Sequence, residues 1–183
     1  MNRAVLIEFS DNDEIFPTSY RIYSYLFDAD GNLTSKTAGE YGEETVSYSY
    51  DGAGRLTGEY HSDGIDATDS WTYTYDRAGN RDGMTRWFVT GFDDDNGVYI
   101  RSSLSTYYIY NKKNQLTAET AGNTTTVYGY DANGNRIGKY GGDFETYTYD
   151  PKNRLIKLTG DWDWDYAFYS YRPDGLRREK TIT

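Results

Sequence analysis

The stretch YGYDANGNRIGKY, residues 128–140, carries residue types that could hold a metal ion or a sugar. Its aspartate and asparagines offer the oxygen ligands that calcium prefers, and aromatic rings beside polar groups suit sugar binding. The same residue types also build tight turns, because Asp accepts backbone N–H groups and Gly or Asn tolerates positive φ. Which interpretation holds depends on whether the pattern recurs in the chain.

Catalytic chemistry finds little support in the sequence. The chain has one histidine, His61, and no cysteine, so a Ser-His-Asp or Cys-His arrangement would depend on that one residue. His61 lies in a stretch rich in Gly and Asp, and we expect an incidental, exposed loop histidine. Glycoside cleavage needs two carboxyl groups roughly 5–10 Å apart in a cleft, one of them with a raised pKa. The acids here lie in turns and hydrophilic runs, which predicts no enzyme and no catalytic residue.

The segment FDDDNGVY, residues 92–99, invites a calcium interpretation. It misses the EF-hand pattern, because Gly97 comes one place early and no glutamate follows at the required distance. Asp93 and Asp95 remain weak candidates for adventitious calcium. We expect an exposed acidic hairpin tip, and neither a resident metal nor a cofactor.

The segment GDWDWDY, residues 160–166, alternates two tryptophans with three aspartates. Exposed rings flanked by carboxylates are typical of a sugar-binding surface. This makes Trp162, Trp164, Asp163 and Asp165 candidate carbohydrate-binding residues. The alternative is a variable turn whose tryptophans fold back over the rest of the sheet.

The composition of the chain limits the classes of partner that it could bind. The chain has 183 residues, the length of one domain, and a net charge of −10 at pH 7. The negative charge argues against nucleic acid and anionic membranes, because phosphate contacts need clustered Lys and Arg. The apolar run AVLI is too short for a signal peptide or a membrane span. With 21 tyrosines in the chain, tyrosine must bury the surface that aliphatic residues usually bury.

The opening pattern recurs seven times, which favours the turn interpretation. Five clear copies are YSYDGAGRLT from Tyr48, YTYDRAGNRD from Tyr73, YIYNKKNQLT from Tyr108, YGYDANGNRI from Tyr128 and YTYDPKNRLI from Tyr147, with looser copies SYLFDADGNLT from Ser24 and YSYRPDGLRR from Tyr169. The alternation Tyr-x-Tyr places both rings on one face of a strand. The predicted rows are Tyr48, Tyr50, Tyr73, Tyr75, Tyr108, Tyr110, Tyr128, Tyr130, Tyr147, Tyr149, Tyr169 and Tyr171. The predicted turn residues are Asp28, Gly31, Asp51, Gly54, Asp76, Gly79, Asp131, Gly134 and Asp150.

Each copy is predicted to be two strands and two turns of roughly twenty residues. The fold class is then all-β, an antiparallel meander of tandem hairpins in one twisted or curved open sheet, with the Asp turns along one edge. We expect a single domain over residues 1–183. It comprises a capping strand region at 1–22, about seven repeats over 23–178, and an inserted long hairpin near 82–106.

The pattern Y-x-Y-D-x-x-G-[NR]-[LR], nearly intact at 48–56, 73–81 and 128–136, resembles the YD repeat, also called the RHS repeat. The resemblance covers the chain from about residue 20. It implies a spiral β-sheet like those of RHS proteins, toxin-complex shells and teneurins. Asn114 and Asn153 replace Gly and should keep the turn, whereas Arg172 followed by Pro173 predicts a different bend.

We therefore expect a non-catalytic structural module, part of an exported, extracellular shell or stalk. Its partners would be the rest of a larger protein, or further copies that pair through open sheet edges. The alternative is a carbohydrate-binding adhesion module that uses the tryptophans and acids of residues 160–166. A blank glycan screen would disfavour this second function.

Overall fold

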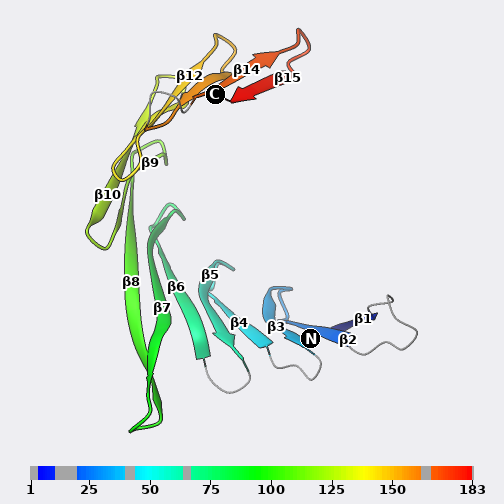
Figure 1. Ribbon diagram of the computed structural model, residues 1–183. Coiled ribbons are helices and arrows are strands. Elements are labelled where there is room, and N and C mark those ends of the chain that lie inside the picture. The colour runs from blue at the N-terminus through cyan, green and yellow to red at the C-terminus, as the bar shows by residue number, and fades with distance from the viewer. Residues whose placement is uncertain (1–3, 11–19, 40–43, 64–66, 162–165, 183) are drawn as a thin grey trace. The chain divides into compact units, whose positions relative to one another are not determined.

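The computed structural model describes residues 4–10, 20–39, 44–63, 67–161 and 166–182 (Figure 1). These residues form fifteen strands and their connections, and none of them lies in a helix. The described chain thus provides no helix that could cross a membrane. The strands are β1 (Ala4–Ser10), β2 (Tyr20–Phe27), β3 (Leu33–Gly39), β4 (Glu44–Tyr50), β5 (Leu56–Ser62), β6 (Ala67–Tyr75), β7 (Arg81–Asp93), β8 (Val98–Tyr110), β9 (Leu116–Ala121), β10 (Thr124–Tyr130), β11 (Arg136–Tyr140), β12 (Glu145–Tyr149), β13 (Leu155–Thr159), β14 (Tyr166–Tyr171) and β15 (Arg177–Ile182).

The strands follow one another as a meander. Each strand is hydrogen-bonded to its neighbours in sequence, from β1 to β15, and the order does not close on itself. The pairs from β1 to β6 and from β8 to β15 are antiparallel. Because aromatic and β-branched residues favour extended backbone, the repeated Tyr-x-Tyr and Thr-rich segments supply the strands. The prediction of an all-β antiparallel meander is confirmed.

A repeated turn joins each even-numbered strand to the odd-numbered strand after it. In a meander, alternate connections lie at the same edge of the sheet, so these turns share one edge within each compact part of the chain. We call this edge the turn edge. The pairing register shifts by one residue next to the turn in six hairpins, for example between Ser49 and Tyr50 and between Gly129 and Tyr130. Such a shift is the signature of a β-bulge, which increases the local twist of the strand.

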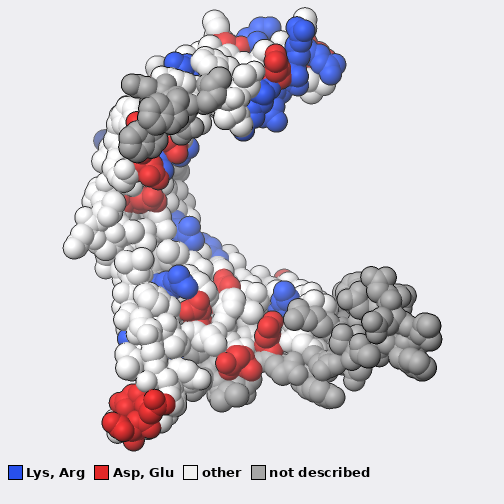
Figure 2. All heavy atoms as spheres, in the orientation of Figure 1, with Lys and Arg blue, Asp and Glu red and all other residues white. Residues whose placement is uncertain are grey.

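The chain folds into two compact units, residues 1–76 with 83–105, and residues 77–82 with 106–183. β7 and β8 have 13 residues each, and within the first unit the tip of their hairpin extends beyond the end of β6 (Figure 1). Figure 2 shows acidic side chains gathered at this tip, where the sequence reads Asp93, Asp94 and Asp95. Several large apolar side chains of the hairpin are exposed, among them Trp87, Phe92 and Ile100.

The core of the described sheet is thin. The buried apolar residues are Ala38, Tyr128 and Ala167, and no large described side chain is fully buried. The other paired tyrosines are half-buried, while residues between the two tyrosines of a pair, such as Ile109 and Thr148, face solvent. Tyrosine rings and the alkyl stems of neighbouring basic side chains therefore provide the packing that a second layer of structure would normally supply.

Candidate functional site: the turn edge and its contacts between repeats

Each repeated turn is a five-residue unit, and the one at Asp51 shows its construction. The amide of Asp51 donates to the carbonyl of Arg55 at 2.9 Å, and the amide of Gly54 donates to the carbonyl of Asp51 at 2.9 Å. Oδ1 of Asp51 accepts from the amides of Ala53 at 2.9 Å and Arg55 at 3.0 Å. The carboxylate thus satisfies two backbone donors that the turn leaves outside the ladder.

The second carboxylate oxygen is bound by the side chain four residues later. Oδ2 of Asp51 accepts from Nε of Arg55 at 2.7 Å, and Oδ2 of Asp150 accepts from Nε of Arg154 at 2.7 Å. The same contact is made by Asn32 to Asp28 at 2.9 Å and by Asn135 to Asp131 at 2.8 Å. The sequence analysis missed this side-chain pair. The recurrence of Asn or Arg at the fourth position after Asp was the signal that could have found it.

These contacts lower the pKa of the turn carboxyl groups. For Asp28 and Asp131 the largest cause is the side-chain hydrogen bond from Asn32 or Asn135. For Asp150 it is the side-chain bond from Arg154, and for Asp51 the backbone amide of Arg55. A general acid at neutral pH needs the opposite shift, so the turn carboxylates are suited to holding structure and not to donating protons.

The third residue after the turn aspartate adopts positive φ. The glycines at this position are Gly31, Gly54, Gly79, Gly134 and Gly175, with φ between 75° and 92°. Where asparagine replaces glycine, Asn114 and Asn153 have φ of 57° and 58°, and their amides donate to the carbonyls of Asn111 and Asp150. Asn is one of the few residue types that accept this conformation. Asp76 is half-buried at the turn between β6 and β7.

The expectation of a different bend at Arg172 is wrong. The amide of Arg172 donates to the carbonyl of Leu176 at 2.9 Å, and that of Gly175 donates to the carbonyl of Arg172 at 3.0 Å, as in the other turns. Pro173 fits because its fixed φ suits the second position of a type I turn. The missing carboxylate is replaced by that of Asp174, which accepts from the amide of Leu176 at 3.0 Å.

The second tyrosine of a repeat makes a hydrogen bond to the backbone of the repeat before it. The hydroxyl-to-carbonyl pairs are Tyr50 to Leu33 at 2.8 Å, Tyr75 to Leu56 at 2.7 Å, Tyr110 to Arg81 at 3.1 Å, Tyr130 to Leu116 at 2.8 Å and Tyr171 to Leu155 at 2.8 Å. The ladder of β3 with β4 runs only from Ser35 to Ala38, so the carbonyl of Leu33 lies beyond it. The tyrosine hydroxyl therefore binds a carbonyl at the end of the ladder, where the two strands separate.

Arginine side chains also link successive repeats. Arg55 and Arg154 lie over the second tyrosine of the next repeat, at 4.6 Å from the Tyr75 ring and 4.7 Å from the Tyr171 ring. Arg81 lies over the first tyrosine of the next repeat, 5.3 Å from the Tyr108 ring. A guanidinium over a ring is attracted by the negative face of the ring. In these repeats the tyrosine hydroxyls are thus hydrogen-bonded to backbone carbonyls, and guanidinium groups lie over the faces of tyrosine rings.

Neighbouring turns touch each other directly at the turn edge of the second unit. Oδ1 of Asn153 accepts from the side-chain amides of Asn133 at 3.1 Å and Asn135 at 2.9 Å. Oδ1 of Asn114 accepts from the side chain of Asn80 at 3.2 Å. Asparagine at the positive-φ position therefore does more than tolerate the turn, because it bonds the preceding repeat. Glycine has no side chain to do this.

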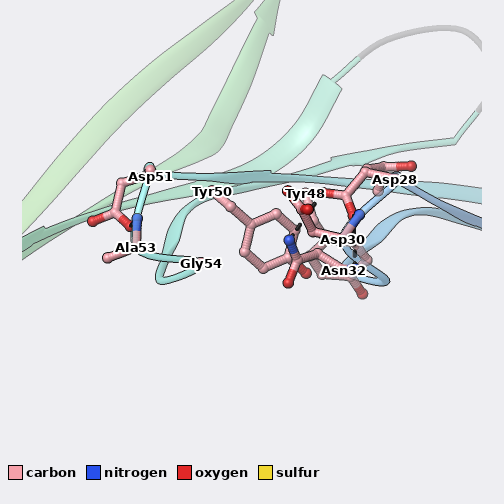
Figure 3. Close-up of a pocket in the computed structure, with 10 residues that line it drawn as sticks. Asp28, Asp30, Asn32, Tyr48, Tyr50, Asp51, Ala53 and Gly54 are labelled. Carbon is pink, nitrogen blue, oxygen red and sulfur yellow. Dashed lines mark hydrogen bonds between the residues drawn. The ribbon is translucent and has the colours of Figure 1, made fainter.

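A groove lies between two turns of the first unit (Figure 3). Its volume is about 670 Å³, and it is lined by the turn from Asp28 to Asn32, the turn from Asp51 to Gly54, and the rings of Tyr48 and Tyr50. Burial raises the pKa of both tyrosines, with Glu59 as a further cause at Tyr48 and Asp28 at Tyr50. The groove combines aromatic rings with carboxylates.

The other candidate residues are dispersed. His61 lies in strand β5 and not in a loop, so that expectation is wrong; its Nε2 is 2.6 Å from Oε1 of Glu59, and its ring contacts Trp71. Asp93 accepts from the amides of Asp95 and Asn96 at the β7–β8 tip. No group of three or more candidate metal ligands occurs among the described residues. Trp162, Asp163, Trp164 and Asp165 lie outside the described residues.

Comparisons with known proteins show what part of the chain is similar to. A family model described as RHS Repeat matches residues 27–67. No curated protein matches the chain. Among solved structures, the chain is similar to TcdB2-TccC3-Cdc42 (12% identity, TM-score 0.35, 90% of this chain and 11% of that chain), to TcdB2-TccC3 without its hypervariable C-terminal region (12%, 0.41, 90% and 11%), and to TcdB2-TccC3 (11%, 0.37, 90% and 14%).

The chain spans 11% of the length of the first of these chains and 14% of the third. The family match covers the turns at Asp28 and Asp51, together with the strands that they join. Residues 27–67 are therefore similar to an RHS repeat.

Proposed function

We propose that the chain is a non-catalytic structural and interaction module, a segment of an exported shell or stalk built from RHS repeats. The observation that carries this proposal is that the turn carboxylates and the tyrosine hydroxyls of the repeats form hydrogen bonds with other groups of the repeats. The carboxylate of Asp51 accepts three hydrogen bonds within its own turn. The hydroxyl of Tyr75 binds the carbonyl of Leu56 in the preceding repeat. Groups engaged in this way hold repeats together and are not available to a substrate.

Partners follow from the open ends of the sheet. β1 and β15 are the outermost strands of the described order, and an outer strand presents backbone donors and acceptors that can pair with another strand. We infer that the module pairs through these edges, with further repeats of a larger protein or with copies of itself. An extracellular or cell-surface location would suit such a shell.

The module proposal is tested by two measurements on the full chain. Sedimentation over a concentration series should show reversible association, and a panel of chromogenic glycosides should show no turnover above buffer. A strictly monomeric mass at high concentration would contradict edge pairing. Turnover that disappears in a single carboxylate variant would contradict the absence of catalysis.

A carbohydrate-binding module is the second candidate, and the groove at Tyr48 and Tyr50 favours it. Rings can pack against a sugar, and carboxylates beside them can accept its hydroxyl donors. Asp30 lines the groove, and its backbone amide donates to the carboxylate of Asp28. The other candidate surface comprises Trp162 and Trp164 with Asp163 and Asp165.

A glycan array followed by tryptophan-fluorescence titration tests this candidate. Binding that is lost in Trp162→Ala, Trp164→Ala would place the site at the tryptophans. Binding that is lost in Asp30→Asn would place it in the groove. A blank array with unchanged fluorescence would leave the structural module alone.

A further inference from the structure

The hairpins β10–β11 and β14–β15 share one pairing register. Tyr130 faces Arg136 and Tyr171 faces Arg177; Gly129 faces Gly138 and Ser170 faces Glu179; Tyr128 faces Lys139 and Tyr169 faces Lys180. Each hairpin also has its register shift at the second tyrosine of the repeat. Arg177 and Lys180 of β15 therefore occupy the positions that Arg136 and Lys139 occupy in β11.

In the interior of the sheet, those two positions of β11 receive the next strand, β12. The guanidinium of Arg136 lies 5.5 Å from the ring of Tyr128 on its own hairpin and 4.7 Å from the ring of Tyr147 on β12. Its Nη2 donates to the hydroxyl of Tyr147 at 2.7 Å. Lys139 faces Glu145 across the same strand pair, with Nζ 3.6 Å from Oε1. Strand β12, with the sequence ETYTY, is thus recognised by one arginine and one lysine.

On β15, half of this arrangement is already formed. The guanidinium of Arg177 lies 5.9 Å from the ring of Tyr169, and Nζ of Lys180 lies 6.0 Å from the same ring. β15 is last in the described strand order, so β14 is its neighbour on one side and no described strand pairs with its other side. All six residues of β15 are exposed. The two cations stand where a further Glu and Tyr would complete the arrangement seen between β11 and β12.

We propose that the outer edge of β15 is a docking site for a β-strand of another RHS-type repeat, with the pattern Glu-x-Tyr-x-Tyr. The incoming strand pairs antiparallel with β15. Its glutamate faces Lys180, and its first tyrosine covers Arg177 and accepts a hydrogen bond from the guanidinium. The inference rests on the proposed function, because it names the strand chemistry that one open edge selects.

A second copy of this chain is a poorer occupant of the site. Two β15 strands side by side would each contribute three basic residues, Arg177, Arg178 and Lys180, against the single acid Glu179. This leaves an excess of like charges, and like charges opposite each other destabilise a strand pair. The other outermost strand, β1, reads AVLIEFS and has no Tyr-x-Tyr pair. Charge and ring placement therefore favour a strand like β12.

The test uses the full chain and a fluorescein-labelled peptide of residues 144–159, which carries β12, its turn and β13. Fluorescence anisotropy should show saturable binding. Arg177→Leu should weaken it by roughly tenfold, because a stacked, hydrogen-bonded cation is lost. Arg178→Leu is the matched control, since it removes the same charge from the same strand at a position that is Ile137 in β11. It should change the affinity by less than about twofold.

A charge exchange makes the test specific. Lys180→Glu in the chain should weaken binding of the peptide by about fivefold. A peptide with Glu145→Lys should bind the Lys180→Glu chain with the original affinity and should bind the unaltered chain poorly. Lys180 is exposed, so the thermal midpoint of the Lys180→Glu chain should stay unchanged. A restored affinity also shows directly that the variant is folded.

The inference is overturned if the peptide shows no saturable binding, if Arg178→Leu weakens binding as much as Arg177→Leu, or if the charge exchange gives no recovery. Sedimentation separates this failure from a failure of the proposed function. If the chain associates with its own copies but does not bind the peptide, the proposed edge-pairing module stands and the proposed selection of Glu-x-Tyr-x-Tyr is wrong. If the chain is strictly monomeric and does not bind the peptide, both proposals are wrong.

Discussion

The hydroxyl of Tyr128 donates a 2.8 Å hydrogen bond to Oε1 of Glu119, across the hairpin formed by β9 and β10. Tyr128 is also one of the few buried apolar residues among those described. A ring that is buried and a hydroxyl that is bonded to a carboxylate both favour the neutral phenol over the phenolate. The thin sheet therefore depends on tyrosines that stay protonated.

The first prediction concerns alkaline pH. Burial, and then the hydrogen bonds to Glu119 and Glu145, raise the pKa of Tyr128 and Tyr147 to about 12, from 10.0. Because the folded state holds these protons more tightly than the unfolded chain, the stability they provide is present below pH 10. It is lost as the pH rises towards 12. Urea unfolding followed by circular dichroism between pH 9 and 12 should show this loss, and Tyr128→Phe should make it shallower. An equal slope in the variant would contradict the assignment.

The second prediction tests the hydrogen bond between a tyrosine and the preceding repeat. Tyr130→Phe leaves the carbonyl of Leu116 without the hydroxyl that it binds at 2.8 Å. The free energy of unfolding should fall by about 1 kcal/mol. Tyr107→Phe is the control, since Tyr107 is 63% exposed, and it should have little effect. Equal effects of the two substitutions in urea unfolding would argue against a role for the hydrogen bond.

The third prediction separates the two roles of asparagine at the positive-φ position. Asn153→Gly keeps the turn but loses the two bonds from Asn133 and Asn135, which should cost about 1 kcal/mol. Asn153→Ala should cost about 1 kcal/mol more, because at a φ of 58° alanine has neither the freedom of glycine nor the polar side chain that lets asparagine adopt this conformation.

The matched control for the third prediction is Gly31→Asn. At Gly31 a Cβ would meet nothing within 4 Å, and the turn at Asp28 is the first of the repeated turns, so an asparagine there has no preceding repeated turn to bond. Its effect on urea unfolding should be small. If Asn153→Gly proves as stable as the unaltered chain, the bonds between turns contribute nothing.

The fourth prediction exchanges the side-chain pair of one turn for that of another. Asn111 and Gln115 form the neutral version, in which the Asn111 amide donates to Gln115 at 2.8 Å. Asp51→Asn alone should lower the unfolding midpoint, because its amide would face the donor Nε of Arg55. The double change Asp51→Asn, Arg55→Gln should restore part of the midpoint, since it also removes the cation that lies over the Tyr75 ring.

The same variants carry an acid test. The pKa of Asp51 is lowered, so the stability it provides is present above its ordinary value of 3.8 and is lost as the pH falls through the folded-state pKa. The double variant should therefore lose less stability than the unaltered chain between pH 7 and pH 3. An identical acid response in thermal unfolding would show that the carboxylate does not contribute.

Much of the fold could be predicted from the sequence because the same pattern recurs several times. Tyr-x-Tyr defines a strand and its face, and Asp with Gly or Asn three residues later defines the turn, so the meander follows. The error at Arg172 came from treating the side chain as the cause of the turn. The backbone bonds and Pro173 form it, and Asp174 supplies a carboxylate from a different position.

The contacts between repeats could not be predicted in the same way. Tyr171 is 16 residues from Leu155, and Asn80 is 34 residues from Asn114. Which side chains meet over such separations depends on register shifts and twist, neither of which a local pattern records. His61 was misplaced for a related reason, because the glycine and aspartates that suggested a loop follow the end of β5.

The tyrosine-to-backbone bond has a consequence for how such chains change over time. Four of the acceptors are leucine, namely Leu33, Leu56, Leu116 and Leu155, and the fifth is Arg81, yet each offers the same backbone carbonyl to the next repeat. An acceptor that every residue type provides places no demand on the identity of the neighbour. A recombination event that deletes or duplicates a whole number of repeats therefore leaves this bond intact at the new junction. Chains built this way can gain or lose length in the genome without compensating substitutions at that contact.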